Sequence, residues 1–135
     1  MQRRAAALVL KGDMVLMVKL KDQDRLMPRA TWVFPFVDIS EDDSPRREVN
    51  NLLSSLGIDY SMTNEVFKYS PSENPKLLYL LYVTKYNGRD PEVGHLFQTY
   101  KWVSVSDITA YSTSFMDGNV SKYLEKIKRS TNGTD

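Results

Sequence analysis

The stretch that decides the fold is WVFPFVDISEDDSPRREVNNLLSSLGI, which runs from Trp32 to Ile58. The apolar run Trp32–Val37 predicts a strand, and the acidic segment Asp38–Asp43 predicts a loop after it. Ser44 then has the chemistry of a helix N-cap, and Pro45 suits the first helical position because its missing N–H costs nothing there. The stretch therefore predicts a strand, an acidic loop and a helix in that order.

The predicted helix ends at Gly57, a residue type that readily adopts the left-handed conformation of a helix C-terminus. Between the caps, apolar side chains recur at the spacing i, i+3, i+4 and i+7, at Val49, Leu52, Leu53 and Leu56. Such spacing gives a single apolar stripe. We expect this stripe to pack against a sheet.

The order of strand, acidic loop, helix, glycine and aliphatic residue resembles the Nudix (MutT-like) hydrolases. Their box reads GX5EX7REUXEEXGU, where U is a bulky aliphatic residue, and a Gly-Gly pair usually precedes the acidic loop. In that family the glutamates on the helix bind Mg²⁺ or Mn²⁺ against the diphosphate of a nucleotide. The resemblance implies an α/β fold, an α/β/α sandwich with a central mixed sheet.

The helix carboxylates of this box are missing from the chain. Counting back from Gly57, the Arg-Glu pair of the family falls on Asn50 and Asn51. The Glu-Glu pair of the family falls on Ser54 and Ser55. Every glutamate expected on the helix is therefore an amide or a hydroxyl.

Counting forward from the loop gives the same result. Asp43 takes the place of the first Glu of the box, but the segment from there to Gly57 is one residue shorter than the family pattern. Moving the register by one residue supplies no helix carboxylate either. Phe36 and Val37 occupy the Gly-Gly positions, where the family lets the backbone approach the phosphates. The box is thus degenerate at its glycines as well as at its glutamates.

Divalent magnesium prefers charged oxygen ligands. The bound ion polarises the phosphoryl oxygens of a diphosphate and neutralises their charge during attack by water. Replacing two carboxylates by hydroxyls weakens binding by several kcal/mol if each charged contact contributes about 1.5 to 3 kcal/mol. The favoured hypothesis is therefore a catalytically inactive domain that binds a nucleotide, an RNA phosphate or a protein partner.

For such a domain, the phosphate contacts are expected at the start of the helix, where Arg46 and Arg47 add charge to the helix N-terminus. The polar side chains farther along the helix complete the predicted ligand-binding set: Asn50, Asn51, Ser54 and Ser55. The alternative reading is that the two arginines solubilise the helix and pair with Asp42 or Asp43.

The competing hypothesis is a divergent hydrolase that uses Mg²⁺ or Mn²⁺ on a nucleoside diphosphate derivative. Its candidate metal ligands are Asp38, Glu41 and Asp43. Its candidate catalytic residues are Glu48, Glu92 and His95, the last two in a late loop. The simpler reading is a solvated acidic loop that complements the helix dipole, and a surface histidine.

A second alternative is a structural subunit of a ribonucleoprotein assembly, because inactive members of the resembling family occur there. Dimers are also common in that family, so a homodimer is a further possibility. The sequence contains no dominant apolar patch that identifies a partner.

Composition describes an ordinary globular domain. The chain has 135 residues, a formal net charge of +1 and no cysteine, which excludes disulfides and thiolate metal sites. It contains no apolar run long enough to span a bilayer, so we expect no membrane contact and a cytoplasmic location. We expect one domain over residues 1–129 and a flexible tail over residues 130–135.

The remaining elements follow from apolar runs and turn residues. A hairpin is expected where Ala5–Leu10 and Met14–Leu20 flank Lys11-Gly12-Asp13. Further strands are expected at Val66–Tyr69, Lys76–Tyr86 and Thr99–Val105, followed by a short helix opened by Ser106-Asp107 and a terminal amphipathic helix through Val120, Tyr123, Leu124 and Ile127.

Overall fold

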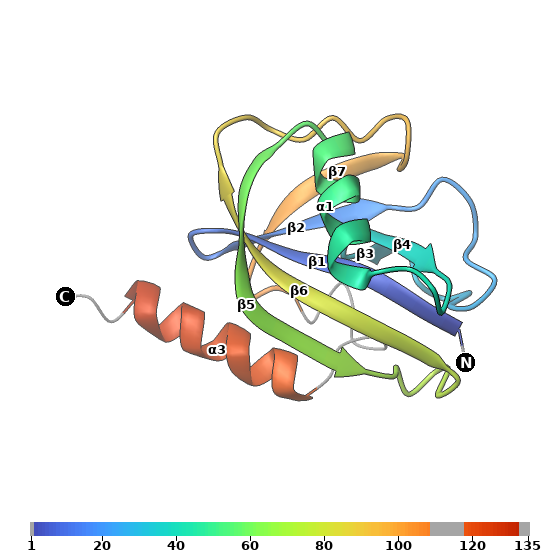
Figure 1. Cartoon of the computed structure of the whole chain (residues 1–135). Coiled ribbons are helices and arrows are strands. Elements are labelled where there is room, and N and C mark those ends of the chain that lie inside the picture. The colour runs from blue at the N-terminus through green and yellow to red at the C-terminus, as the bar shows by residue number, and fades with distance from the viewer. Residues whose placement is uncertain (1, 109–117, 133–135) are drawn as a thin grey trace.

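The computed structural model describes residues 2–108 and 118–132 (Figure 1). The described strands form one seven-stranded sheet, with β3-β2-β1-β6-β5 as its main order, β4 beside β1 and β7 beside β2. Their bounds are β1 Gln2–Lys11, β2 Met14–Lys19, β3 Trp32–Val33, β4 Phe36–Ile39, β5 Asp59–Tyr69, β6 Leu77–Asn87 and β7 Thr99–Ser104. The described helices are α1, Pro45–Ser55, and α3, Gly118–Asn132.

Strand β1 is the centre of the sheet. It pairs in parallel with β6 from Gln2 to Leu10, and antiparallel with β4 and β2 on its other edge. Because it has neighbours on both edges and helix α1 packs on it, its segment Ala5–Leu10 is buried. Its turn to β2 contains Gly12 at a φ of +62°, which confirms the predicted hairpin.

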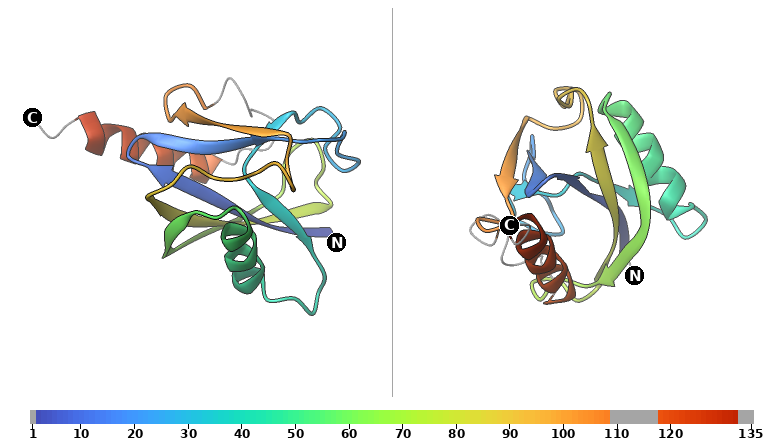
Figure 2. Two further views of the ribbon diagram at one scale, coloured as in Figure 1. Left: turned by 90° about the horizontal axis from the view of Figure 1, so that it is seen from above. Right: turned by 90° about the vertical axis from the view of Figure 1, so that its left-hand side faces the viewer.

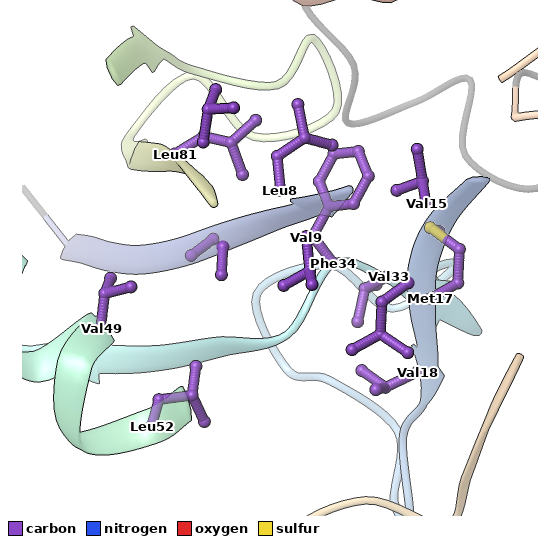
Figure 3. Packing of buried hydrophobic residues seen from close by; sticks show 14 of the residues in the cluster. Leu8, Val9, Val15, Met17, Val18, Val33, Phe34, Val49, Leu52 and Leu81 are labelled. Carbon is purple, nitrogen blue, oxygen red and sulfur yellow. The ribbon is translucent and has the colours of Figure 1, made fainter. Parts of the chain in front are cut away.

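Helix α1 forms at the predicted position. Ser44 is its N-cap and accepts a hydrogen bond from the Arg47 amide, and Leu56 is its C-cap. Gly57 follows at a φ of +69°, a conformation that side chains disfavour. The predicted apolar stripe is buried and packs on β1 and β4, as Figure 3 shows for Val49 and Leu52.

Helix α3 lies on the opposite side of the sheet from α1, as both views in Figure 2 show. Its buried Val120 and Leu124 face the core, and the ring of Tyr123 packs edge-on against Phe67 of β5 with centroids 5.4 Å apart. The sheet is thus mixed and flanked by a helix on each side. This confirms the α/β/α sandwich that the resemblance implies.

Two local predictions were wrong. The strand expected at Trp32–Val37 is two strands, interrupted at Phe34-Pro35, because proline has no amide hydrogen for a strand ladder. Strand β5 begins at Asp59 instead of Val66, as an edge strand rich in polar residues with an irregular register between Met62 and Val66. Residues 105–108 form a turn at the predicted start of the short helix, and residues 109–117, which would continue that helix, lie outside the described residues.

Helix α3 extends to Asn132 and so enters the segment expected to be a tail, while residues 133–135 lie outside the described residues. No described helix has both the length and the apolar character that crossing a bilayer requires.

Candidate functional site

The most unusual group in the molecule is a buried guanidinium on the central strand. The side chain of Arg4 on β1 is only 3% exposed. Its two terminal nitrogens bind both carboxylate oxygens of Asp24, at 2.6 Å from Nη1 and 2.7 Å from Nη2. Its Nε donates to Oδ1 of Asp38 at 2.8 Å. Two carboxylates therefore balance one buried cation.

Two aromatic side chains complete the surroundings of this cation. The guanidinium lies 4.2 Å from the ring centroid of Phe36, a favourable cation–π distance, and Nη1 donates to the Tyr79 hydroxyl at 3.3 Å. Burial alone would lower the pKa of Arg4, but its hydrogen bonds to Asp24, Asp38 and Tyr79 outweigh burial and raise that pKa. Arg4 is therefore permanently charged. We call Arg4, Asp24, Asp38, Phe36 and Tyr79 the Arg4 cluster.

The backbone explains how residues distant in sequence meet here. Arg4 and Asp38 are register partners on the antiparallel strands β1 and β4. Asp24 comes from the loop after β2, and its Oδ1 also accepts the Leu26 amide at 3.0 Å. Burial would raise the pKa of Asp24, but the hydrogen bonds from Arg4 and Leu26 hold it below its usual value. The Arg4 cluster thus fixes this loop to the sheet.

A cleft lies beside the Arg4 cluster and has two parts. The polar hollow, of about 440 Å³, is lined largely by charged and amide side chains, among them Gln2, Gln23 and Arg25. The apolar hollow, of about 340 Å³, is lined by Val37, Leu52, Leu96 and Phe97, with Lys21. Leu20, Asp22, Phe36 and Asp38 line both hollows. We refer to the two adjoining hollows together as the cleft.

Helix α1 contributes Leu52 to the cleft. Glu48 and Ser55 lie one turn before and after Leu52 on the same side of the helix. The Ser55 hydroxyl donates to the backbone oxygen of Asn51 at 3.0 Å, while Oδ1 of Asn50 accepts from the Tyr60 hydroxyl at 2.9 Å. Asn51 and Ser54 are exposed. The polar side chains predicted to bind a ligand are therefore partly engaged within the protein.

The two arginines predicted to bind a phosphate lie outside the described lining of the cleft. Arg46 and Arg47 are exposed on the first turn of α1, and neither lines a described hollow of the cleft. Their contact with a phosphate stays a prediction. The residues that sequence reasoning missed are Arg4 as a buried group, Asp24 and Tyr79. The available signal was an arginine at the start of an otherwise apolar strand.

Solved structures with a similar architecture include Nudix and MutT proteins. The Ap4A hydrolase of C. elegans superposes with a TM-score of 0.68 at 14% identity, over 98% of this chain and 99% of the other. An ADP-ribose pyrophosphatase from Streptococcus suis gives 0.69 at 15% identity, over 95% and 92%. The chain has the Nudix fold. A MutT protein from Methanosarcina mazei is similar too, with a TM-score of 0.67 at 16% identity over 96% and 94%.

No protein-family model and no curated protein matches the sequence. At identities of this size the Nudix fold is what the likeness establishes, and activity has to be argued from the residues.

The divalent metal of the Nudix family does not fit the residues of this Nudix-fold chain. Asp38 shares its carboxylate with Arg4 through Oδ1 and is partly exposed, and Asp43 accepts the Ser40 amide at 2.8 Å, capping its own loop. Glu41 is exposed. Within residues 2–108 and 118–132, no three histidine or carboxylate side chains come together as a metal cage. The candidate ligands Asp38, Glu41 and Asp43 are therefore dispersed.

The late loop does reach the helix, as the hydrolase alternative requires. The Glu92 amide donates to the backbone oxygen of Leu56 at 2.8 Å, which ties this loop to the end of α1. The side chains of Glu92 and His95 are exposed, whereas Leu96 and Phe97 line the apolar hollow. The loop thus brings apolar side chains to the cleft. Catalytic roles for Glu48, Glu92 and His95 stay predictions.

Proposed function

We propose that this Nudix-fold chain binds a nucleotide in the cleft and does not hydrolyse it. The observation that carries the proposal is the composition of α1, whose family glutamate positions hold Asn51, Ser54 and Ser55. Two similar structures are an Ap4A hydrolase and an ADP-ribose pyrophosphatase, which supports nucleotides as the ligand class.

The chemistry of the cleft supports binding more than cleavage. Uncharged amide and hydroxyl oxygens offset little of the cost of dehydrating Mg²⁺, so an anhydride bound here would lack the cation that neutralises its charge. The apolar hollow offers Phe36, Leu52 and Phe97 as walls for a ring, and the polar hollow offers Gln23 and Arg25 for hydroxyl or phosphate groups. Exposed Arg46 and Arg47 provide further positive charge near α1.

The test combines affinity with turnover for Ap4A and ADP-ribose. We expect isothermal titration calorimetry to detect binding that weakens as salt is raised, because phosphate contacts are electrostatic and exposed. We expect chromatography to show no product above the no-enzyme rate with Mg²⁺ or Mn²⁺. Metal-dependent product formation would contradict the proposal.

The divergent hydrolase is the second candidate, and the docking of the Glu92 loop on α1 favours it. It predicts metal-dependent turnover that falls in Glu92→Gln or His95→Asn, while Glu125→Gln on α3 serves as an exposed control away from the cleft. A chain that neither binds nor cleaves nucleotides would leave the protein-partner or homodimer hypothesis. Size-exclusion chromatography with light scattering then separates a monomer from a dimer.

A further inference from the structure

We propose that Asp38 makes the cleft selective for a guanine-type base, by accepting two adjacent N–H donors from the edge of the ring. This inference rests on the proposed nucleotide-binding function and specifies its ligand. The structural basis is the position of Asp38, which lines both the polar and the apolar hollow.

The carboxylate of Asp38 is only partly used by the protein. Its Oδ1 accepts from Nε of Arg4 at 2.8 Å, yet the side chain is 55% exposed. Asp24 is the contrasting case, since its side chain is 7% exposed and both of its oxygens bind Arg4. Asp38 is therefore a positioned carboxylate with acceptor capacity left for a ligand, whereas Asp24 is fully committed.

The hydrogen-bonding sense of this site follows from the charge around it. An ionised carboxylate only accepts hydrogen bonds. Arg4 is the cation nearest to Asp38, and its nitrogens already donate to Asp24, Asp38 and Tyr79. Asp22, which also lines both hollows, adds another acceptor. At Asp38 and Asp22 a ligand edge that donates is thus favoured over one that accepts, while Lys21 in the apolar hollow and Arg25 in the polar hollow can serve acceptor groups of the ligand.

The walls of the apolar hollow favour a planar ring beside this carboxylate. Leu20, Phe36, Leu52 and Phe97 line this open hollow, and its volume of about 340 Å³ is in the usual range for small-ligand sites. Proteins that bind an unpaired base commonly stack its ring on apolar side chains and read its pairing edge by hydrogen bonds. Phe36 is held in place for this role by the Arg4 guanidinium over its ring.

Among common bases, guanine presents two neighbouring donors, N1–H and the exocyclic amine, which match the two oxygens of a carboxylate. Adenine presents an acceptor at N1 next to its amine. Hypoxanthine keeps the N1–H donor but lacks the amine. The predicted order of affinity is therefore guanosine, then inosine, then adenosine.

The first experiment uses these three nucleosides, which carry no phosphate and so isolate base recognition. We expect calorimetry at fixed salt to give guanosine at least roughly fivefold tighter binding than adenosine, with inosine between them. Equal affinity for guanosine and adenosine overturns the inference. Because only the ligand changes, this result does not depend on a variant that folds.

The second experiment uses Asp38→Asn, with Asp42→Asn as the matched control. Both remove one negative charge from the same segment, but Asp42 is exposed and lines neither hollow. We expect Asp38→Asn to lose roughly 5- to 150-fold in guanosine affinity while adenosine affinity changes little, and Asp42→Asn to lose neither. A thermal melt of Asp38→Asn is the check that this variant is folded. Equal losses for both nucleosides overturn the inference.

The outcomes separate this inference from the function it rests on. If no nucleoside or nucleotide binds, both fail. If nucleotides bind without a preference among bases, only the role of Asp38 fails. If guanosine is preferred and a guanosine nucleotide is also hydrolysed with Mg²⁺, only the absence of catalysis fails.

Discussion

The two walls of the cleft differ in whether they bury charged side chains. The sheet wall, from β1, β4 and the loop after β2, buries the charges of Arg4 and Asp24 and positions Asp38. The helix wall, from α1, lines the cleft with Leu52, and Glu48 and Ser55 lie one turn away on the same side of the helix. In the Nudix family that this fold resembles, the helix is the charged wall. Here the buried ion pair belongs to the sheet wall, and the family glutamate positions of the helix hold Asn51, Ser54 and Ser55.

This difference indicates which wall of the cleft contributes to the stability of the fold. Removing a guanidinium and a carboxylate from water is costly, so Arg4 and Asp24 are tolerated only because they are paired and hydrogen-bonded. Asn51, Ser54 and Ser55 of α1 are exposed, so water can hydrogen-bond to their side chains without an ionic partner. Changes on the sheet wall should therefore affect stability, and changes on the helix wall should affect ligands.

The largest effect is expected for Arg4→Met. Removing the cation leaves Asp24 buried without its partner, which should lower the free energy of unfolding by about 3 to 5 kcal/mol. Urea denaturation monitored by tryptophan fluorescence measures the change. Arg25→Met is the control, because Arg25 is exposed in the same loop and should stay within about 0.5 kcal/mol of the native chain. Similar losses in both variants would mean that the Arg4 pair has no special role.

The next prediction converts the helix wall into a charged one. Asn51→Glu, Ser54→Glu and Ser55→Glu together restore the glutamates of the Nudix box in the register counted from Gly57. At about 1.5 kcal/mol or more for each of two charged contacts, Mn²⁺ should bind roughly a hundredfold more tightly. Electron paramagnetic resonance of free Mn²⁺ measures this affinity.

The control for added charge replaces the exposed, uncharged Ser61, Asn64 and Ser70, on and just after strand β5, by glutamate, which adds the same three negative charges without the helix spacing of the box. This variant should gain no tight Mn²⁺ site. If both triple variants bind Mn²⁺ equally, negative charge alone attracts the ion and the helix geometry of the box is irrelevant.

Acid stability tests the sheet wall again. The folded-state pKa of Asp24 is lowered, so its contribution to stability is present above the unfolded pKa of about 4 and is lost as pH falls through the folded value. Asp24→Asn should cost about 1.5 to 3 kcal/mol at neutral pH. The gap between its urea stability and that of the native chain should narrow below about pH 4. A gap that stays constant down to pH 2 would contradict this assignment.

Local sequence patterns predicted the elements whose signals are local. The hairpin, α1 with its caps and β6 follow from turn residues, cap residues and apolar spacing within a few positions. The Arg4–Asp24 pair was not predictable, because its members lie 20 positions apart and an ion pair across a loop leaves no periodic signal. The break in the strand at Pro35 was visible in the sequence, but the apolar residues around it favoured a continuous strand.

The candidate site was predictable in composition more than in geometry. The loss of carboxylates from α1 is a property of the sequence alone. Which side of α1 meets the cleft depends on the rotation of the helix, and a register uncertain by one residue turns a helix by about 100°. Asn50 shows the consequence, since it was expected to contact a ligand and its side-chain oxygen accepts a hydrogen bond from Tyr60.

The smallest predicted effect concerns this contact and tests whether Asn50 serves the fold. Asn50→Ala and Tyr60→Phe each remove one partner of the bond, and the double variant removes both. A double-mutant cycle in urea should give a coupling of about 0.5 to 1.5 kcal/mol, as for a typical hydrogen bond. Guanosine affinity should be unchanged in all three variants, because neither residue lines a described hollow of the cleft. Coupling near zero together with weakened guanosine binding would instead assign Asn50 to the ligand, and the helix wall would then take part in recognition.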